Sequence, residues 1–172
     1  GKTLRTGSNP RVYADGNITI NSSGKLEYTS SQSFLTIKPG KTMRVNFDGT
    51  SSFTTSIGDP STGIPQGALV IQSYNQDSFT SAFSSSAWIF SDNLSSLIIG
   101  KSTNSADVTL ATATTIAGPI TVYGGDITIS SAQTATGGNI NLHASGSVTQ
   151  SAALTANGLG LFGTGTFTLQ NS

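Results

Sequence analysis

The last third of the chain, residues 106–170, repeats itself about every 19 to 20 residues. A column of threonines marks the repeat, each set between mostly apolar neighbours: Thr109, Thr128, Thr149 and Thr168. Because side chains alternate along a strand, the apolar neighbours point to one side and the threonines to the other. Short strands at this period, separated by glycine and small polar residues, predict a solenoid in which equivalent strands of successive coils lie together.

A second column supports the same register. It consists of apolar pairs that bracket one residue: Ile120 and Val122, Ile140 and Leu142, Leu159 and Leu161. Two or three short strands per coil are typical of a parallel β-helix, whose backbone hydrogen bonds join coils about 4.8 Å apart. We therefore predict an all-β fold, a right-handed parallel β-helix with about 19–20 residues per coil. This prediction requires one interior file made of Val108, Ile127, Val148 and Phe167.

We predict a single domain, residues 1–172, which falls into three parts according to how regular the repeat is. Residues 1–58 are expected to form irregular N-terminal coils or a cap, with short strands at 17–20, 26–29, 34–37, 43–47 and 53–57. Residues 59–96 are expected to form a loop, a strand at 68–74 and then an irregular aromatic-rich insertion. Residues 97–172 are the regular coils.

The aromatic-rich stretch contains Phe79, Phe83, Trp88 and Phe90. The spacing of Phe79 and Phe83 places both rings on one face of a helical turn, for which Ser78 is a suitable cap. We expect this insertion to fold across the side of the helix and to bury its rings, since aromatic side chains carry large apolar areas. The alternative is a ligand surface in which exposed Trp88 and Phe90 stack on sugar rings.

Composition agrees with a solenoid and excludes several partners. Charged residues make up only 9% of the chain, hydrophobic residues 35%, and there is no cysteine. Seven of the eight basic residues precede Val45, whereas the later part is mostly acidic, a gradient that would help copies dock end to end; scattered surface charge is the alternative. The chain lacks a basic stripe interleaved with aromatics and any apolar run of about 20 residues, which argues against nucleic-acid binding and membrane insertion.

The candidates for chemistry are few. His143 is the only histidine, and no second histidine, cysteine or nearby carboxylate stands in its coil, so we expect a solvated or hydrogen-bonded side chain without a metal or acid–base role. Asp107 and Asp126 begin equivalent strands one coil apart and could hold calcium or act as paired carboxylates. Because Ser147 and Thr166 follow in that column, turn formation is the favoured interpretation. The sequence predicts no catalytic residue, no metal and no cofactor.

Residues 94–130 read LSSLIIGKSTNSADVTLATATTIAGPITVYGGDITIS. This run resembles the repeat of giant bacterial surface proteins, the filamentous-haemagglutinin-like and gliding-adhesin-like proteins, in which an LTIGK-type segment leads into IAGPI and VYGGDI. The similarity extends over about residues 68–149. It implies an exported right-handed β-helix that acts in attachment to substrata, neighbouring cells or hosts, and it implies no catalytic motif.

These observations lead to one functional expectation. The chain is predicted to be a non-enzymatic structural or adhesive module of a secreted or cell-surface bacterial protein, a rigid stalk or attachment surface. The alternatives are a solenoid that binds ice through its threonine column or carbohydrate through exposed aromatic rings, or the subunit of a self-assembling extracellular filament. Expected partners are neighbouring repeats, copies of the chain end to end, or a carbohydrate or surface ligand. Because the chain begins at Gly1, we expect a processed product or an excised piece.

Overall fold

A computed structural model of the protein describes residues 11–14, 18–22, 26–27, 36–39, 42–47, 51–52, 55–57, 66–73, 76–90, 92 and 94–170. Side chains are described within these ranges from Gly67 onward, except at positions 87 and 89. Every strand pairing in this part of the chain is parallel. The predicted all-β parallel solenoid is thus confirmed.

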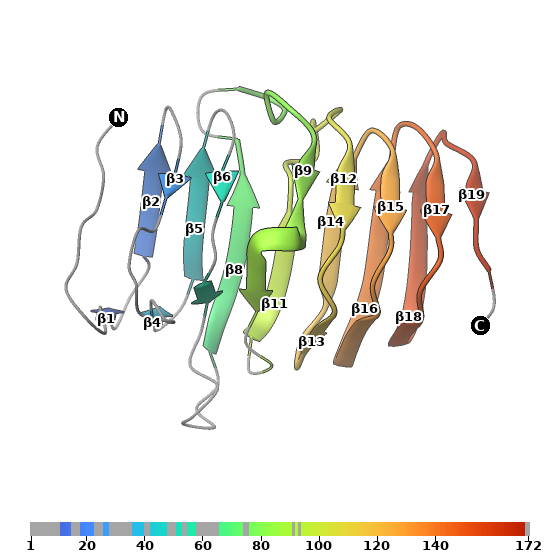
Figure 1. Cartoon of the computed structure of the whole chain (residues 1–172). Helices are drawn as coiled ribbons and strands as arrows, with labels where there is room; N and C mark the ends of the chain where they lie inside the picture. The colour runs from blue at the N-terminus through green and yellow to red at the C-terminus, as the bar shows by residue number, and fades with distance from the viewer. Residues whose placement is uncertain are drawn as a thin grey trace.

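The larger sheet runs along the length of the solenoid (Figure 1). Its strands follow one another in the order β2 (Ile18–Ser22), β5 (Thr42–Phe47), β8 (Gln66–Gln72), β11 (Leu94–Ile99), β14 (Ile120–Gly124), β16 (Gln133–Ala144) and β18 (Leu154–Gly163). Each strand pairs with its equivalents in the preceding and following coils, so the backbone hydrogen bonds of this sheet join coil to coil.

The second sheet forms another side of the solenoid. Its strands are β9 (Phe83–Ser84), β12 (Val108–Leu110), β15 (Ile127–Ile129), β17 (Val148–Gln150) and β19 (Phe167–Thr168). The register places Val108, Ile127, Val148 and Phe167 opposite one another. The first three are fully buried and Phe167 packs against the core. The interior file that the sequence predicted is therefore confirmed.

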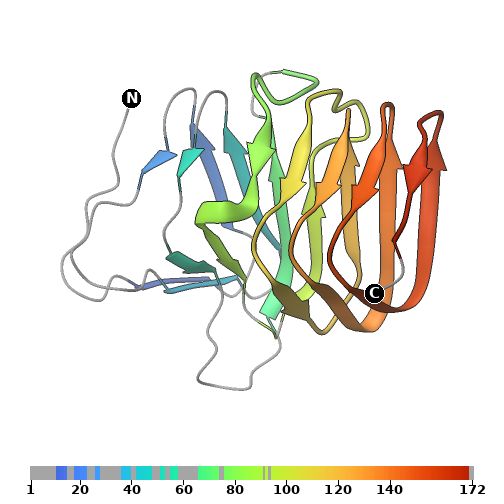
Figure 2. The same cartoon turned by 45° about the vertical axis from the view of Figure 1, so that its right-hand side comes forward.

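The remaining side of each regular coil is formed by a short strand, β13 (Thr114–Ile116), or by the first half of a long one, β16 or β18. β13 pairs with the start of β16, which then bends and continues beside β14 (Figure 2). A register shift between Ala135 and Asn139 marks the bend in the pairing of β16 with β18. Ile116 and Ala135 are buried on the inner side, so all three sides contribute to one core.

Coil length changes along the chain. In the regular part, Asp107 and Asp126 occupy equivalent corners 19 residues apart, and Asp126 and Ser147 are 21 apart. The preceding coil is wider, since Ser85 bonds to Ala111, which lies 26 residues further on. The predicted period therefore holds for the C-terminal coils and lengthens towards the middle of the chain, where the extra residues carry the aromatic side chains.

The N-terminal strands also pair in parallel. β2 and β5 continue the larger sheet from β8, and three short pairs are β1 (Arg11–Ala14) with β4 (Thr36–Pro39), β3 (Leu26–Glu27) with β6 (Ser51–Ser52), and β7 (Thr55–Ile57) with β10 (Trp88–Phe90). The strands expected at 17–20, 26–29, 34–37, 43–47 and 53–57 overlap β2, β3, β4, β5 and β7, whereas β1 and β6 were not expected. The loop expected at 59–65 lies outside the described residues.

The aromatic-rich stretch is part of the core. Phe79 stacks on Phe83 at 5.4 Å between ring centroids, Phe83 lies 5.8 Å from Trp88, and Trp88 lies 6.1 Å from Phe90. Phe83 belongs to β9 and pairs with Val108, so its ring extends the interior file of the second sheet. The expected burial is confirmed, but the rings fill a wide coil from within and do not lie across its side.

The helical turn expected at Phe79 and Phe83 is wrong. Phe83 lies in a strand, and the helical turn comes later as the short 3-10 helix η1 (Ser85–Ala87), where the Ser86 N–H donates to the Ser84 hydroxyl at 3.3 Å. Ser78 does not cap a helix, because its hydroxyl donates to Asn104 Oδ1 at 2.8 Å and accepts from Ala106 N–H at 3.0 Å. Contacts between coils thus override the local helical spacing.

The last coil exposes side chains that belong to interior files. Leu159 and Leu161 lie opposite the fully buried Ile140 and Leu142. They are nevertheless 43% and 37% exposed, since the described chain places no further coil over them. The core therefore opens to solvent at this end of the described solenoid.

Candidate functional site

The threonine column lies on the outer side of the second sheet. The pairings place Thr109, Thr128, Thr149 and Thr168 opposite one another, and the last three are exposed. Successive hydroxyl and methyl groups therefore follow the solenoid axis, as the sequence predicted. Their role as a ligand surface stays a prediction.

The other proposed ligand residues do not form a platform. Trp88 is 0% exposed and belongs to the core, and Phe90 is partly buried against it. A sugar cannot stack on a side chain without accessible surface, so Trp88 is a packing residue in this fold. Its place is consistent with the large apolar area of an indole ring.

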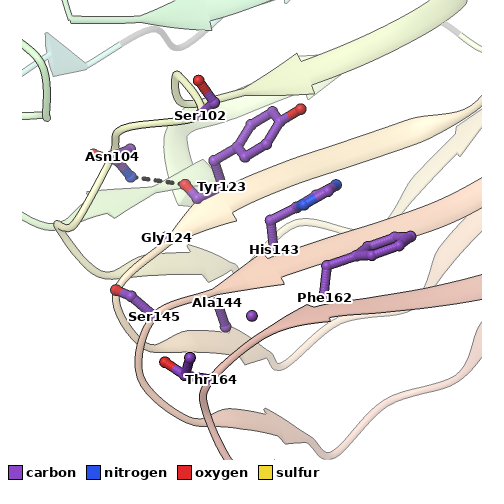
Figure 3. Close-up of a pocket in the computed structure, with 10 residues that line it drawn as sticks. Ser102, Asn104, Tyr123, Gly124, His143, Ala144, Ser145, Phe162 and Thr164 are labelled. Atoms are coloured by element: carbon purple, nitrogen blue, oxygen red, sulfur yellow. Dashed lines mark hydrogen bonds between the residues drawn. The ribbon is translucent and has the colours of Figure 1, made fainter.

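The structure brings together three rings that the sequence analysis did not group. Tyr123, His143 and Phe162 lie opposite one another on β14, β16 and β18, on the outer side of the larger sheet. The ring centroids of Tyr123 and His143 are 4.5 Å apart, and those of His143 and Phe162 are 4.4 Å apart. The planes differ by 28° and 13°, so the rings form a continuous stack across three coils (Figure 3). We call this set the aromatic ladder.

The ladder forms one wall of a surface groove of about 460 Å³. The other lining residues are small or hydroxyl-bearing and come from the adjoining turns: Ser102, Asn104, Gly124, Ala144, Ser145, Gly163 and Thr164. The groove crosses three strands and does not run along a sheet edge, because β16 is paired on both sides. None of its lining residues is an acid, a lysine or an arginine.

Burial between its neighbours lowers the pKa of His143 below the ordinary value of 6.5. The lowered pKa favours the neutral imidazole at pH 7. The sequence-based expectation of a solvated or hydrogen-bonded side chain missed this stacking. Nothing in the local sequence around His143 indicates it, since Tyr123 and Phe162 are each about 20 residues away.

Asn104 lines the groove and is hydrogen-bonded to neighbouring coils. Its Oδ1 accepts from the Ser78 hydroxyl and from Phe79 N–H at 2.8 and 2.9 Å. Its Nδ2 donates to the carbonyl oxygens of Ala106 at 3.1 Å and Tyr123 at 2.7 Å. Asn104 is 6% exposed, and its amide joins its own coil to the preceding and the following one and fixes the strand end that carries Tyr123.

The two aspartates of the repeat bridge successive coils. Asp107 Oδ1 accepts from the Asp126 N–H at 2.9 Å, and Asp126 Oδ1 accepts from the Ser147 N–H at 2.6 Å. Each carboxylate thus satisfies a backbone donor at the same corner of the next coil, which agrees with the turn role favoured from the sequence. Within the described ranges, no three His, Cys, Asp or Glu side chains come together as a candidate metal site. No helix of the described chain is long and apolar enough to span a membrane.

Comparison with protein-family models, with curated proteins and with solved structures finds no match. The strand pairings alone define the class of the chain, a parallel β-solenoid with a buried aromatic cluster. The resemblance of residues 94–130 to bacterial surface repeats stays a prediction.

Proposed function

We propose that this chain is a non-enzymatic structural and adhesive module of a secreted or cell-surface bacterial protein. The observation that carries the proposal is the continuous core, in which equivalent residues of successive coils, such as Val108, Ile127 and Val148, pack on one another. A structure whose coils share core and hydrogen bonds is stiff along its axis. Such a rod suits a stalk or a surface that is held away from a cell.

The polar side chains at the coil corners support a structural role. Asp107 and Asp126 use their carboxylates on backbone N–H groups, and Asn104 and Gln133 bind backbone carbonyls within and between coils. Groups engaged in this way position the chain, which supports a structural role. The outer faces offer threonine hydroxyls and the aromatic ladder as attachment surfaces.

Flow-cell adhesion tests this proposal directly. Beads coated with the folded chain are passed over glass, polystyrene and glycan-coated surfaces, with albumin-coated beads and beads bearing the heat-unfolded chain as controls. We expect retention of the folded-chain beads on at least one surface. Retention no greater than that of the albumin control on every surface would overturn the adhesive role, and a hydrolytic activity towards the surface polymer would overturn the non-enzymatic one.

A second candidate function rests on the threonine column. Thr128, Thr149 and Thr168 are exposed in register, which presents a regular row of methyl and hydroxyl groups to water. An ice-binding role predicts thermal hysteresis at micromolar protein that disappears in Thr149→Tyr. An adhesive module without ice affinity shows no freezing gap.

The open core supports the expected partners. Leu159 and Leu161 are exposed only because nothing in the described chain covers them, and a coil of the same register would. Neighbouring repeats or copies of this chain placed end to end are the partners that we propose for this surface. Negative-stain electron microscopy distinguishes the two arrangements by showing single short rods or long filaments.

A further inference from the structure

The groove beside the aromatic ladder combines two kinds of surface. One wall consists of the rings of Tyr123, His143 and Phe162, which project from neighbouring strands in the same direction (Figure 3). The rest of the lining includes the hydroxyl groups of Ser102, Ser145 and Thr164. A ligand that fits this groove must therefore offer apolar surface to the rings and hydrogen-bonding groups to these hydroxyls.

The rings present accessible surface although they stack on one another. Phe162 is 47% exposed, and His143 covers only one of its faces. The edges of Tyr123 and His143 also border the groove, and aromatic edges carry partial positive charge that attracts oxygen atoms. The ladder thus offers the exposed part of the Phe162 ring and two positive edges.

The lining hydroxyls are available for a ligand. The side chains of Ser102, Ser145 and Thr164 form no hydrogen bond within the described chain, whereas Ser78, Ser85 and Ser131 each bond to a neighbouring coil. The lining bears no acidic side chain, no lysine and no arginine, and the neutral state of His143 leaves the wall uncharged at pH 7. Such a lining selects against strongly charged ligands, because nothing in it compensates their desolvation.

We propose that this groove binds an uncharged oligosaccharide, with a sugar ring packed against the exposed part of the Phe162 side chain and its hydroxyl groups directed to Ser145, Thr164 and the tips of the ladder. The proposal rests on the adhesive function above and names its ligand class. A pyranose suits the site because the rings can meet its apolar C–H groups and the serine and threonine side chains can meet its hydroxyl groups.

An extended peptide fits the groove less well. Peptides that bind to sheets add a strand to an open edge and hydrogen-bond through their backbones. Here the backbone groups of β16 are already paired with β14 and β18, so a peptide would have to rely on side chains alone. Recognition through rings and hydroxyl groups is the mode that the surface provides.

The test uses the purified chain and a panel of neutral oligosaccharides: cellohexaose, maltohexaose, xylohexaose, mannohexaose and chitohexaose. Saturation-transfer NMR identifies which member binds, and titration calorimetry measures the affinity. We expect transfer to sugar ring C–H protons and a Kd below about 10 mM, weakened about tenfold or more in Phe162→Ala and largely retained in Phe162→Tyr. The matched control is Leu169→Ala, which removes another exposed apolar side chain near the C-terminal end (39% exposed) and is expected to bind normally.

Three outcomes would overturn the proposal: no panel member binds at about 10 mM, Phe162→Ala binds a sugar as wild type does, or a phenylalanine-containing peptide binds this groove and the sugars do not. Circular dichroism confirms that each variant is folded. The adhesion assay is run on Phe162→Ala in parallel. If Phe162→Ala beads lose sugar binding but are still retained, the adhesive function stands and this groove does not carry it. If the wild-type chain binds a sugar but its beads are retained on no surface, the groove proposal stands and the adhesive function is rejected.

Discussion

The imidazole of His143 lies against the ring of Phe162, with centroids 4.4 Å apart and planes that differ by 13°. These residues belong to neighbouring coils and pair directly across β16 and β18. Since Tyr123 covers the other face of the imidazole, His143 is held between two rings. This arrangement predicts both a spectroscopic signature and a pH dependence.

The single histidine can be followed directly by proton NMR. We expect its imidazole protons to be shifted upfield by the two neighbouring rings and its pKa to lie below 6.5. Phe162→Ala should reduce the upfield shift and return the pKa towards its ordinary value, because it opens one face of the imidazole to water. An unshifted resonance that titrates as in a free peptide would contradict the stacked arrangement.

The same lowered pKa of His143 predicts how stability depends on pH. Between the ordinary value of 6.5 and the lower value in the folded chain, the unfolded chain binds more protons than the folded one. The free energy of unfolding therefore decreases as pH falls through 6.5 and levels off below the folded-state pKa. Urea unfolding at several pH values between 7.5 and 5 should show this slope in wild type and a flatter one in His143→Gln, where only the remaining groups titrate.

Asn104 is expected to be among the most sensitive polar positions. Asn104→Leu removes the acceptor for Ser78 and Phe79 and the donor to Tyr123, and it should lower the free energy of unfolding by about 2–4 kcal/mol because buried partners lose their hydrogen bonds. Thr103→Ala, which removes one bond from an exposed neighbour, should cost less than about 1 kcal/mol. If the two variants lower the free energy of unfolding equally in chemical unfolding, the hydrogen bonds of Asn104 contribute no more than the single bond of Thr103.

The interior file predicts a contrast between adjacent residues. Ile127→Ala leaves a cavity among fully buried side chains and should destabilise the protein by about 2–5 kcal/mol. Thr128→Ala changes an exposed side chain on the same strand and should change stability by no more than about 0.5 kcal/mol. Thermal or urea unfolding measures both. A larger effect at Thr128 than at Ile127 would mean that β15 faces the opposite way.

Gly100 occupies a conformation that other residues rarely adopt. Its φ is +84°, and a Cβ there would lie 2.5 Å from the carbonyl oxygen of Tyr123. Gly100→Ala should therefore destabilise the fold by about 2–4 kcal/mol through backbone strain and the clash. The companion variant Ser102→Ala, at an exposed position nearby, should melt within a degree or two of wild type. A Gly100→Ala protein that melts like Ser102→Ala would contradict the close approach.

The exposed leucines of β18 predict self-association. Apolar patches favour contact with a complementary surface, so sedimentation velocity should show larger species as protein concentration rises. Replacing Leu159 and Leu161 by lysine should shift the protein towards monomer, whereas Thr155→Lys on the same strand should not. Association that is indifferent to the double variant would place the contact elsewhere.

The sequence by itself determined the repeat and the interior. Pairs such as Val108 with Ile127 and Ile140 with Leu159 follow from alternation along strands and a constant period, because identical coils bring equivalent residues together. Each ring of the aromatic ladder directly follows one of the aligned residues Val122, Leu142 and Leu161. The same repeat register therefore also predicts that the three rings lie together.

Only the tertiary structure decided the rest. The spacing of Phe79 and Phe83 fits a helical turn, yet the pairing of Phe83 with Val108 makes it a strand, since hydrogen bonds between coils outweigh a local preference. Burial of Trp88, the wider middle coil and the groove beside the ladder likewise depend on how coils of unequal length stack. A repeat fixes which residues are equivalent, but which surfaces become core and which remain open depends on the neighbour that each coil meets.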